Sequence, residues 1–277
     1  MEAKSAYFRA NTDIGQNFLV DAGVLDRIIA AADPQPGEIL LEIGAGNGVL
    51  TRRLLSRSPA RLYAVEMDRR LAPFLNPLEK DPAFILLWGD VLGMHLAEEL
   101  SPCPGRLVAN LPYHITTPLL WKLLEELVPA GLREMTLMVQ KEAANRLAWG
   151  RPGKNRSPLG ITLQKMGRVE CLFDVPPSAF RPAPKVNSTV VSILIQQNFD
   201  LALDPLWREL LQRAFDQRRK TLLNNLRNWL GTRGIDGESL LRELALNEKV
   251  RAEELSLEDW DRLRKTLSEE PGEKGRS

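Results

Sequence analysis

Short apolar runs rich in β-branched residues alternate with longer helix-like segments from about residue 18 to residue 195. This alternation predicts a parallel sheet with crossover helices, two of which we place at Val49–Arg57 and Pro118–Leu127. The predicted strands are Ile39–Ile43, Leu62–Glu66, Phe84–Trp88, Leu107–Asn110, Met135–Gln140, Glu170–Val175 and Thr189–Ile195. Only the loop Pro176–Ser188 separates the last two, which is too short for a helical crossover, so we expect them to pair antiparallel. The fold class is therefore α/β, a mostly parallel seven-stranded sheet with an antiparallel last pair.

The pattern changes after Gln197, where strands disappear and apolar residues recur at helical spacing. The apolar positions include Leu211, Phe215, Leu222, Leu226 and Trp229. We therefore predict two domains, residues 1–197 and residues 198–277, of which the second is small and all-α.

Composition argues against a membrane-spanning, secreted, disulfide-rich or zinc-binding protein. The chain has 277 residues and 44% hydrophobic content, enough to fill a substantial core. It has no apolar run of the length needed to span a bilayer and no signal-peptide pattern, so we expect a cytoplasmic protein. Two cysteines, Cys103 and Cys171, and two histidines, His95 and His114, support neither a disulfide framework nor a zinc site. We expect no metal.

Charge is distributed unevenly, although the formal net charge is only +1. Residues 141–230 hold about 15 Lys or Arg against about 7 Asp or Glu. A basic region favours a polyanionic partner, because cations that neutralise phosphates release condensed counterions. On charge alone, an ordinary solvated surface is an equally good interpretation.

A glycine-rich turn follows the first predicted strand, at Gly44-Ala45-Gly46-Asn47-Gly48. Glycines allow the backbone to approach a ligand at the carboxyl edge of a doubly wound sheet. Val49 stands where a dinucleotide-binding motif needs its third glycine, which disfavours a nicotinamide cofactor. An ordinary strand-to-helix corner remains the alternative.

Carboxylates follow the next two strands. Glu66 comes about 20 residues after the glycine turn, where it can accept hydrogen bonds from both hydroxyls of a ribose. Asp90 follows the third strand, in a position to accept from an adenine amine. Met67 and Val91, the next residues along the chain, are expected to line the same pocket. The series suits a nucleoside cofactor without a pyrophosphate, such as S-adenosylmethionine.

The fourth strand ends in Asn110-Leu111-Pro112-Tyr113, residue types that suit methylation of an aromatic amine. The lone pair of adenine N6 is delocalised into the ring, so acceptors at its two N–H groups can localise it. The Asn110 side chain and the Leu111 backbone carbonyl are the candidate acceptors. Pro112 would fix the turn, and Tyr113 offers a ring for stacking. A plain turn with a packed tyrosine is the alternative, and His114 receives no catalytic role.

With these motifs the chain resembles the rRNA adenine N6,N6-dimethyltransferases of the KsgA/RsmA type, from about Ile14 to the end of the helical domain. The opening motif of that family stands here as Gly15-Gln16-Asn17-Phe18-Leu19, from which Asn17 and Leu19 are implied to bind the cofactor. The family's cofactor residues also match Gly44, Glu66, Asp90 and Asn110, and Gly46 belongs to the same turn. Two further motifs match its target-base loop and its helical domain, namely Phe180–Ser188 and Phe215–Thr221.

The resemblance implies a class I (Rossmann-like) methyltransferase domain that binds S-adenosylmethionine, followed by a helical RNA-binding domain. Phe180 is implied to stack on the flipped adenine opposite Tyr113. Arg213, Lys220 and Arg227 recur every seventh residue, so we predict one helix face that contacts phosphates. The candidate RNA-binding residues are Arg181, Lys185, Arg213, Arg218, Arg219, Lys220 and Arg227.

The implied reaction is dimethylation of two neighbouring adenosines near the 3′ end of small-subunit rRNA, by a monomer acting on a pre-30S particle during subunit biogenesis. The large-subunit enzymes that confer macrolide resistance are the nearest alternative, although they often have Ile where this chain has Leu111. A DNA adenine methyltransferase is a weaker alternative. A non-catalytic assembly or transcription factor is the alternative from another class, and the intact Glu66, Asp90 and Asn110 argue against it.

Overall fold

The computed structural model describes residues 16–149 and 152–269. The chain forms two compact units, and each of them is built from two separate stretches. The first contains Met1–Asn145 and Gly167–Gln196, and the second contains Arg146–Met166 and Gln197–Ser277. The division near residue 197 lies where the strand pattern ends, but Arg146–Met166 belongs to the second unit rather than to the first.

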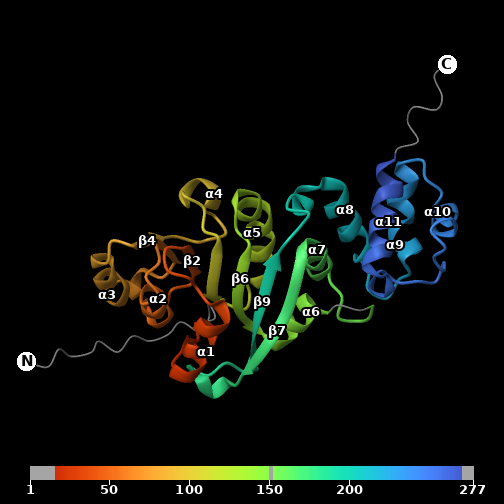
Figure 1. Cartoon of the computed structure of the whole chain (residues 1–277). Helices are drawn as coiled ribbons and strands as arrows, with labels where there is room; N and C mark the ends of the chain where they lie inside the picture. Colours follow the sequence, from red (N-terminus) through yellow and green to blue (C-terminus); the bar gives the residue numbers. More distant parts are fainter. Residues whose placement is uncertain (1–15, 150–151, 270–277) are drawn as a thin grey trace, which may run out of the picture. The chain divides into compact units, whose positions relative to one another are not determined.

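A seven-stranded sheet forms the centre of the first unit, in the order β4-β3-β2-β5-β6-β9-β7 (Figure 1). Its strands are β2 (Ile39–Ile43), β3 (Arg61–Glu66), β4 (Phe84–Trp88), β5 (Arg106–Asn110), β6 (Glu134–Gln140), β7 (Gly167–Val175) and β9 (Ser188–Ile195). The predicted strands are confirmed to within a few residues at their ends. Most apolar residues of the inner strands β2, β3, β5, β6 and β9 are buried, which helps sequence alone to locate them, whereas the edge strands β4 and β7 are largely part-exposed.

Strands β2 to β6 are paired in parallel, and β9 runs antiparallel to both of its neighbours, β6 and β7. The predicted antiparallel pairing of the last two strands is therefore confirmed. The sequence did not reveal that β9 inserts between β6 and β7. A second, two-stranded sheet joins β1 (Phe18–Leu19) to β8 (Phe180–Arg181), so two segments far apart in sequence meet.

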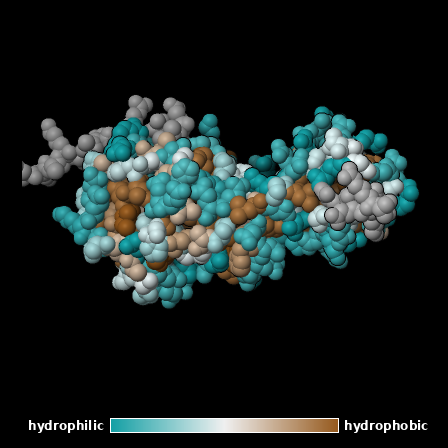
Figure 2. All heavy atoms as spheres, turned by 90° about the horizontal axis from the view of Figure 1, so that it is seen from above, coloured by the Kyte–Doolittle hydropathy of each residue, from teal (hydrophilic) through white to brown (hydrophobic). Residues whose placement is uncertain are grey.

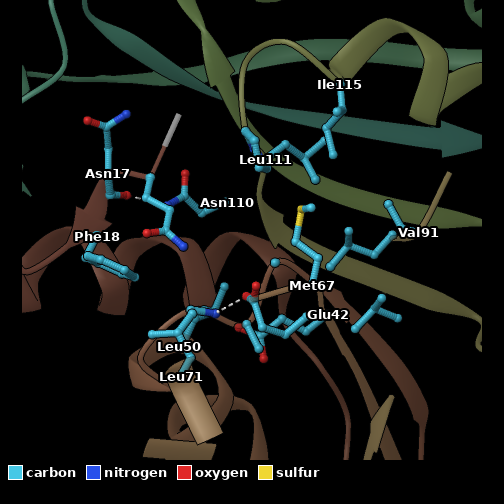
Figure 3. A pocket seen from close by; sticks show the side chains of 18 of the residues that line it. Asn17, Phe18, Glu42, Leu50, Met67, Leu71, Val91, Asn110, Leu111 and Ile115 are labelled. Atoms are coloured by element: carbon cyan, nitrogen blue, oxygen red, sulfur yellow. Dashed lines mark hydrogen bonds between the residues drawn. The ribbon is translucent and has the colours of Figure 1, made fainter. Parts of the chain in front are cut away.

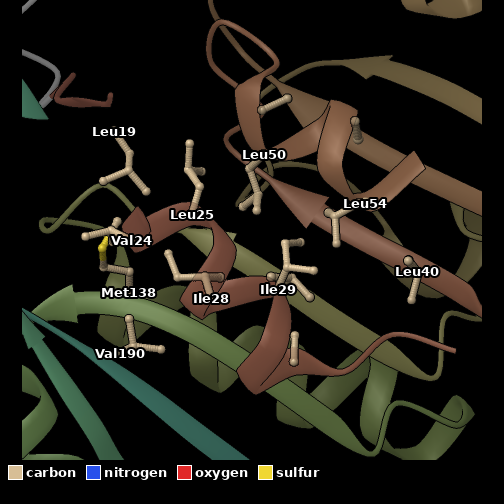
Figure 4. Close-up of a cluster of buried hydrophobic side chains, with 14 of the residues drawn as sticks. Leu19, Val24, Leu25, Ile28, Ile29, Leu40, Leu50, Leu54, Met138 and Val190 are labelled. Carbon is tan, nitrogen blue, oxygen red and sulfur yellow. The ribbon is translucent and has the colours of Figure 1, made fainter. Parts of the chain in front are cut away.

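Helices flank the large sheet and bury its apolar residues. They are α1 (Ala22–Ala32), α2 (Val49–Leu55), α3 (Ala72–Leu75), α4 (Leu96–Glu99) and α5 (Thr116–Ala130). Asp21 caps α1, because its side chain accepts a hydrogen bond from Val24 N at 3.0 Å. In Figure 4 the α1 side chains Leu25, Ile28 and Ile29 point into a cluster shared with Leu40, Leu54, Met138 and Val190. This packing holds α1 beside the strands whose ends form the site described below.

The second unit consists of helices, which the loss of strand pattern predicted for the chain after Gln197. They are α7 (Pro158–Met166), α8 (Pro205–Ala214), α9 (Leu222–Thr232), α10 (Gly237–Glu243) and α11 (Leu257–Ser268), and α6 (Lys141–Ala148) spans the boundary between the units. Trp207 and Trp260 pack edge to face at 6.4 Å, and the Trp207 ring N–H donates to Thr162 Oγ1 at 2.9 Å. The α7 segment is therefore part of the helical core.

The outer surface is mainly polar, with smaller apolar areas between the charged side chains in the view of Figure 2. Within residues 16–149 and 152–269, no helix combines the length and the apolar character required to cross a bilayer.

Candidate functional site

A cavity of about 350 Å³ lies at the carboxyl ends of β2, β3, β4 and β5. Four segments that follow these strands line it, namely residues 44–47, 66–67, 89–92 and 110–115. Residues 16–19 contribute another wall. Since parallel strands bring their carboxyl ends to one edge, motifs that are far apart in sequence meet here, as the sequence analysis predicted.

The glycine turn needs a backbone that other residues rarely adopt. Gly44, Gly46 and Gly48 have φ values of +76°, +59° and +76°. A Cβ atom added to Gly46 would lie 3.3 Å from the ring of Phe18, so the turn also passes tightly under β1. The Gly44 N–H donates to Val65 O at 2.8 Å, which ties the turn to the end of β3.

Glu66 lies beside this turn at the end of β3 and is only 6% exposed. One carboxylate oxygen accepts from Gly46 N at 2.9 Å, and the other accepts from Asp68 N at 2.8 Å. Burial raises the pKa of Glu66, and these backbone donors oppose the rise. Each oxygen has a further lone pair, so Glu66 can still accept hydrogen bonds from a ligand.

Met67, Asp90 and Val91 occupy the adjoining wall. The Met67 side chain is 56% exposed at the cavity, whereas Val91 is buried. Asp90 Oδ1 accepts from Leu92 N at 3.0 Å and closes a tight turn. Apolar side chains and a carboxylate therefore share this wall, an arrangement that suits a flat heterocycle with an amine at its edge.

Asn110 is the last residue of β5, and its amide is held by the N-terminal segment. Its Nδ2 donates to the backbone carbonyl of Asn17 at 3.3 Å (Figure 3). This contact leaves Oδ1 as the acceptor atom of the amide. The Leu111 N–H donates to Met138 O at 3.1 Å, so the backbone after Asn110 stays joined to β6 while Pro112 turns it away.

Tyr113 lines the cavity and is partly buried. Its hydroxyl lies 2.8 Å from the hydroxyl of Ser188, at the start of β9. Burial raises the pKa of Tyr113, so the phenol remains protonated at neutral pH. The neighbouring His114 also borders the cavity but is exposed.

Glu42 is a cavity residue that the sequence analysis missed. It lies within β2, is 1% exposed, and has no hydrogen-bond partner for its Oε2 among the described residues. Burial raises its pKa to about 8, and the negative charge of Glu66 adds to the rise. A charged residue inside the apolar run Ile39–Ile43 was the signal available in the sequence.

Phe180 lies elsewhere than the stacking prediction requires. It belongs to β8, is 1% exposed, and packs in the same apolar cluster as Leu19 and Val24. It does not line the cavity. The reason is the pairing of β8 with β1, which places Phe180 opposite Leu19 and turns its ring into the core. Stacking on a base would require this ring to leave the core.

The residues implied to bind the cofactor and the target base otherwise lie together. Asn17, Leu19, Gly44, Gly46, Glu66, Met67, Asp90, Val91, Asn110, Leu111, Pro112 and Tyr113 all line the cavity. Gly15 of the opening motif lies outside the described residues.

The predicted single basic helix face is wrong. Arg213 lies on α8 and Arg227 on α9, whereas Lys220 lies in the connection between these helices. Helix α8 ends at Ala214, and a separate helix begins after Thr221, whose side chain accepts from Asn224 N at 3.2 Å. All seven candidate RNA-binding side chains are nevertheless exposed: Arg181, Lys185, Arg213, Arg218, Arg219, Lys220 and Arg227.

Metal ligands do not cluster in the described ranges. Within residues 16–149 and 152–269, no group of three or more His, Cys, Asp or Glu side chains could hold a metal ion.

Comparison with known proteins assigns these motifs to one family. Residues 7–269 match the family described as Ribosomal RNA adenine dimethylase. The chain is 40% identical over 270 residues to "Ribosomal RNA small subunit methyltransferase A" of Pseudomonas syringae pv. tomato, covering 94% of this chain and 96% of that one. The protein with the same description from Alkaliphilus oremlandii is 38% identical over 272 residues, covering 94% and 93%.

Solved structures agree with the fold. A dimethyladenosine transferase from Plasmodium falciparum superposes with a TM-score of 0.74 at 26% identity, covering 91% of this chain and 97% of that chain. The 23S rRNA methyltransferase ErmE superposes with a TM-score of 0.67 at 24% identity, covering 91% and 100%, and supports the fold alone.

Proposed function

Since the chain belongs to the ribosomal RNA adenine dimethylase family, we propose that it dimethylates N6 of two adjacent adenosines near the 3′ end of small-subunit rRNA. The observation that carries this proposal is the position of Asn110 to Tyr113 at a cavity that also contains Glu66 and Asp90. The turn proposed to bind the target amine therefore lies at the same cavity as the two carboxylates proposed to bind the cofactor.

The described residues fit S-adenosylmethionine. Glu66 is a buried carboxylate with lone pairs for the two ribose hydroxyls, and Asp90 can accept from the adenine amine. Met67 and Val91 supply apolar surface for the ring. The cavity of about 350 Å³ is of the order of known small-ligand pockets.

When bound, S-adenosylmethionine supplies an electrophilic methyl group on a sulfonium. The protein then has to orient the acceptor amine. Asn110 Oδ1 and the Leu111 carbonyl accept from the two N6–H groups and draw the nitrogen towards tetrahedral geometry, which localises its lone pair. Tyr113 offers a partly buried ring on which the base can stack. Methylation makes the nitrogen a cation, which is acidic enough to release its N6 proton to water, so positioning rather than a strong general base supplies the acceleration.

Exposed cations provide the electrostatic part of substrate binding. Arg181 ends β8 and Lys185 lies on the loop between β8 and β9, whereas Arg218, Arg219 and Lys220 lie between α8 and α9. We place the enzyme in the cytoplasm, as a monomer that acts on a pre-30S particle and contributes to biogenesis of the small subunit. Association through phosphates makes binding weaken as salt rises.

The alternative target is the large subunit. The names of the relatives, at 38% and 40% identity over nearly the whole chain, favour the small subunit. Leu111 and the Phe215–Thr221 segment support the same choice.

The test is to incubate the protein with labelled S-adenosylmethionine and with 30S particles, 50S particles or DNA, and then to map the modified base. We expect two neighbouring dimethylated adenosines in the 30S particles alone. Label in 50S particles would favour the large-subunit alternative. Binding to 30S particles without label would favour a non-catalytic assembly factor.

A further inference from the structure

We propose that Ser188 is a positioning residue that holds the ring of Tyr113 in place for the target base. The inference rests on the proposed function, because Tyr113 has to stack on the base for its orientation to matter. The observation behind it is the contact of 2.8 Å between the two hydroxyl oxygens.

Ser188 is a rigid anchor. It is the first residue of β9, it is 0% exposed, and it pairs with Gln140 of β6 on one side and Val175 of β7 on the other. The residue before it is fixed as well, because the carbonyl of Asn187 accepts from Lys141 N at 3.0 Å. The Ser188 hydroxyl therefore has little freedom to move.

Tyr113 has a weaker attachment of its own. It lies between β5 and α5, in a turn whose nearest backbone hydrogen bond runs from Ile115 N to Pro112 O at 3.2 Å. A tyrosine side chain can rotate about two bonds, so a turn fixes one end of the ring only. The bond to Ser188 fixes the other end, and it joins the turn after β5 to a strand that is distant in sequence.

This bond also joins two parts of the substrate site. Ser188 directly follows the loop between β8 and β9, residues 182–187, where Lys185 and Val186 are exposed. The bond therefore connects the ring on which the base would stack with the loop that an RNA strand would contact. The Ser188 hydroxyl thus sets the distance between the stacking surface and the loop.

The hydrogen bond is partly buried, and neither hydroxyl has an alternative side-chain partner among the described residues. Both hydroxyls carry a proton at neutral pH, so either of them can donate in this bond. Without the bond, the ring would sample other rotamers and the amine would leave its acceptors at Asn110 and Leu111 for part of the time.

The test uses Ser188→Ala, Tyr113→Phe and the double variant, assayed with 30S particles and labelled S-adenosylmethionine. A neutral hydrogen bond contributes on the order of 1 kcal/mol, so we expect kcat to fall about 2- to 10-fold in each single variant. KM for the cofactor should not change, because neither hydroxyl is needed to bind it. The double variant should be no slower than the slower single variant, since both changes remove one bond.

Thr189→Val is the matched control. Thr189 is the next residue of β9, it is 3% exposed, and its hydroxyl donates to Asp174 Oδ1 at 2.7 Å. Thr189→Val should lose about as much stability as Ser188→Ala but keep the kcat of the wild type. A fall in kcat that occurs only in Ser188→Ala is then due to the lost hydrogen bond to Tyr113 and not to a general loss of stability. If Ser188→Ala does not fold, the test compares kcat of Tyr113→Phe, which also removes the bond, with kcat of Thr189→Val, which leaves it in place.

Two results would overturn the inference while the wild type remains active. One is an unchanged kcat in both Ser188→Ala and Tyr113→Phe. The other is a double variant whose loss equals the product of the two single losses, which would mean that the hydroxyls act independently. An inactive wild type would refute the proposed function itself, and the two failures are therefore distinguishable.

Discussion

The side-chain amide of Asn110 donates a hydrogen bond to the backbone carbonyl of Asn17, at 3.3 Å between nitrogen and oxygen. The N-terminal segment thereby determines which atom of the amide is free to accept. Since Asn17 also lines the cavity, binding of a cofactor there and orientation of the amine acceptor are linked through one contact. Substitutions at Asn110 should therefore affect both catalysis and cofactor binding.

Asn110→Ala should abolish most methylation while it leaves RNA binding intact. Removal of a hydrogen-bonding group that acts on the reacting centre costs about 100- to 1000-fold in kcat. The measurement is initial-rate methylation of 30S particles, with particle binding followed separately. Undiminished turnover would refute the role of the amide.

Asn110→Asp keeps the shape of the side chain but replaces the N–H₂ donor by an oxygen. That oxygen would face the Asn17 carbonyl, and the repulsion should displace either the carboxylate or residues 16–19. We expect weaker cofactor binding than in Asn110→Ala, measured by calorimetry. Equal affinities in the two variants would show that the contact with Asn17 has no influence on the cavity.

The buried acid Glu42 should make stability depend on pH. Its pKa is about 8 in the folded protein and near 4.5 when the chain is unfolded, so the folded state binds more protons between these values. The contribution of Glu42 to the free energy of unfolding is therefore fully present below pH 4.5. It decreases as the pH rises towards 8, by up to about 1.4 kcal/mol per pH unit.

Glu42→Gln is the comparison for this effect, because an amide resembles the protonated carboxyl in shape. Denaturant unfolding measured at several pH values should show that the free energy of unfolding falls less between pH 4.5 and 8 in the variant than in the wild type. Parallel curves for the two proteins would mean that Glu42 ionises normally in the folded state.

Phe180→Ala should destabilise the first unit by about 3–5 kcal/mol, because it removes a ring from a packed core. Phe180→Leu should cost less, on the order of 1 kcal/mol, since most of the volume is kept. Chemical denaturation measures both. A stable but inactive Phe180→Ala variant would instead support a ring that leaves the core to stack on the base.

Replacement of Arg218, Arg219 and Lys220 by alanine should weaken binding to 30S particles and reduce its salt dependence. For every phosphate that the variant no longer neutralises, the slope of log affinity against log salt becomes shallower by about 0.7 to 0.9. Filter binding at several salt concentrations gives this slope. The control removes three other exposed cations of the helical unit, Arg242, Lys249 and Arg251, and should leave the slope unchanged.

Sequence patterns predicted the strands well because most strands are short, almost continuous apolar runs, whether they lie inside the sheet or, like β4, at its edge. Ile39–Ile43 and Phe84–Trp88 have the bounds that the apolar runs indicate. The cavity followed from the same pattern, since parallel strands bring their ends together. Neither α6 nor α7 was predicted, because residues such as Thr162 find their partners far along the chain, here at Trp207.

The missed features depend on pairings that no local pattern encodes. Phe180 could be exposed or buried until its partner Leu19 in β1 is known. The basic residues at seven-residue spacing looked like one helix face, but α8 ends at Ala214 and α9 begins only after Thr221. Glu42 required the observation that a single acid interrupts an otherwise apolar strand.

The division of the helical unit into two stretches affects how the protein forms during synthesis. Arg156 donates to the backbone carbonyl of Leu255, which is made 99 residues later. At typical bacterial and eukaryotic rates, the ribosome adds that length in roughly 5 to 20 s. During this interval the synthesis of the first unit, whose last residue is Gln196, is completed. The stretch Arg146–Met166 then still lacks the later residues of the second unit that it packs with. All residues that line the cavity are therefore synthesised before the second unit is complete.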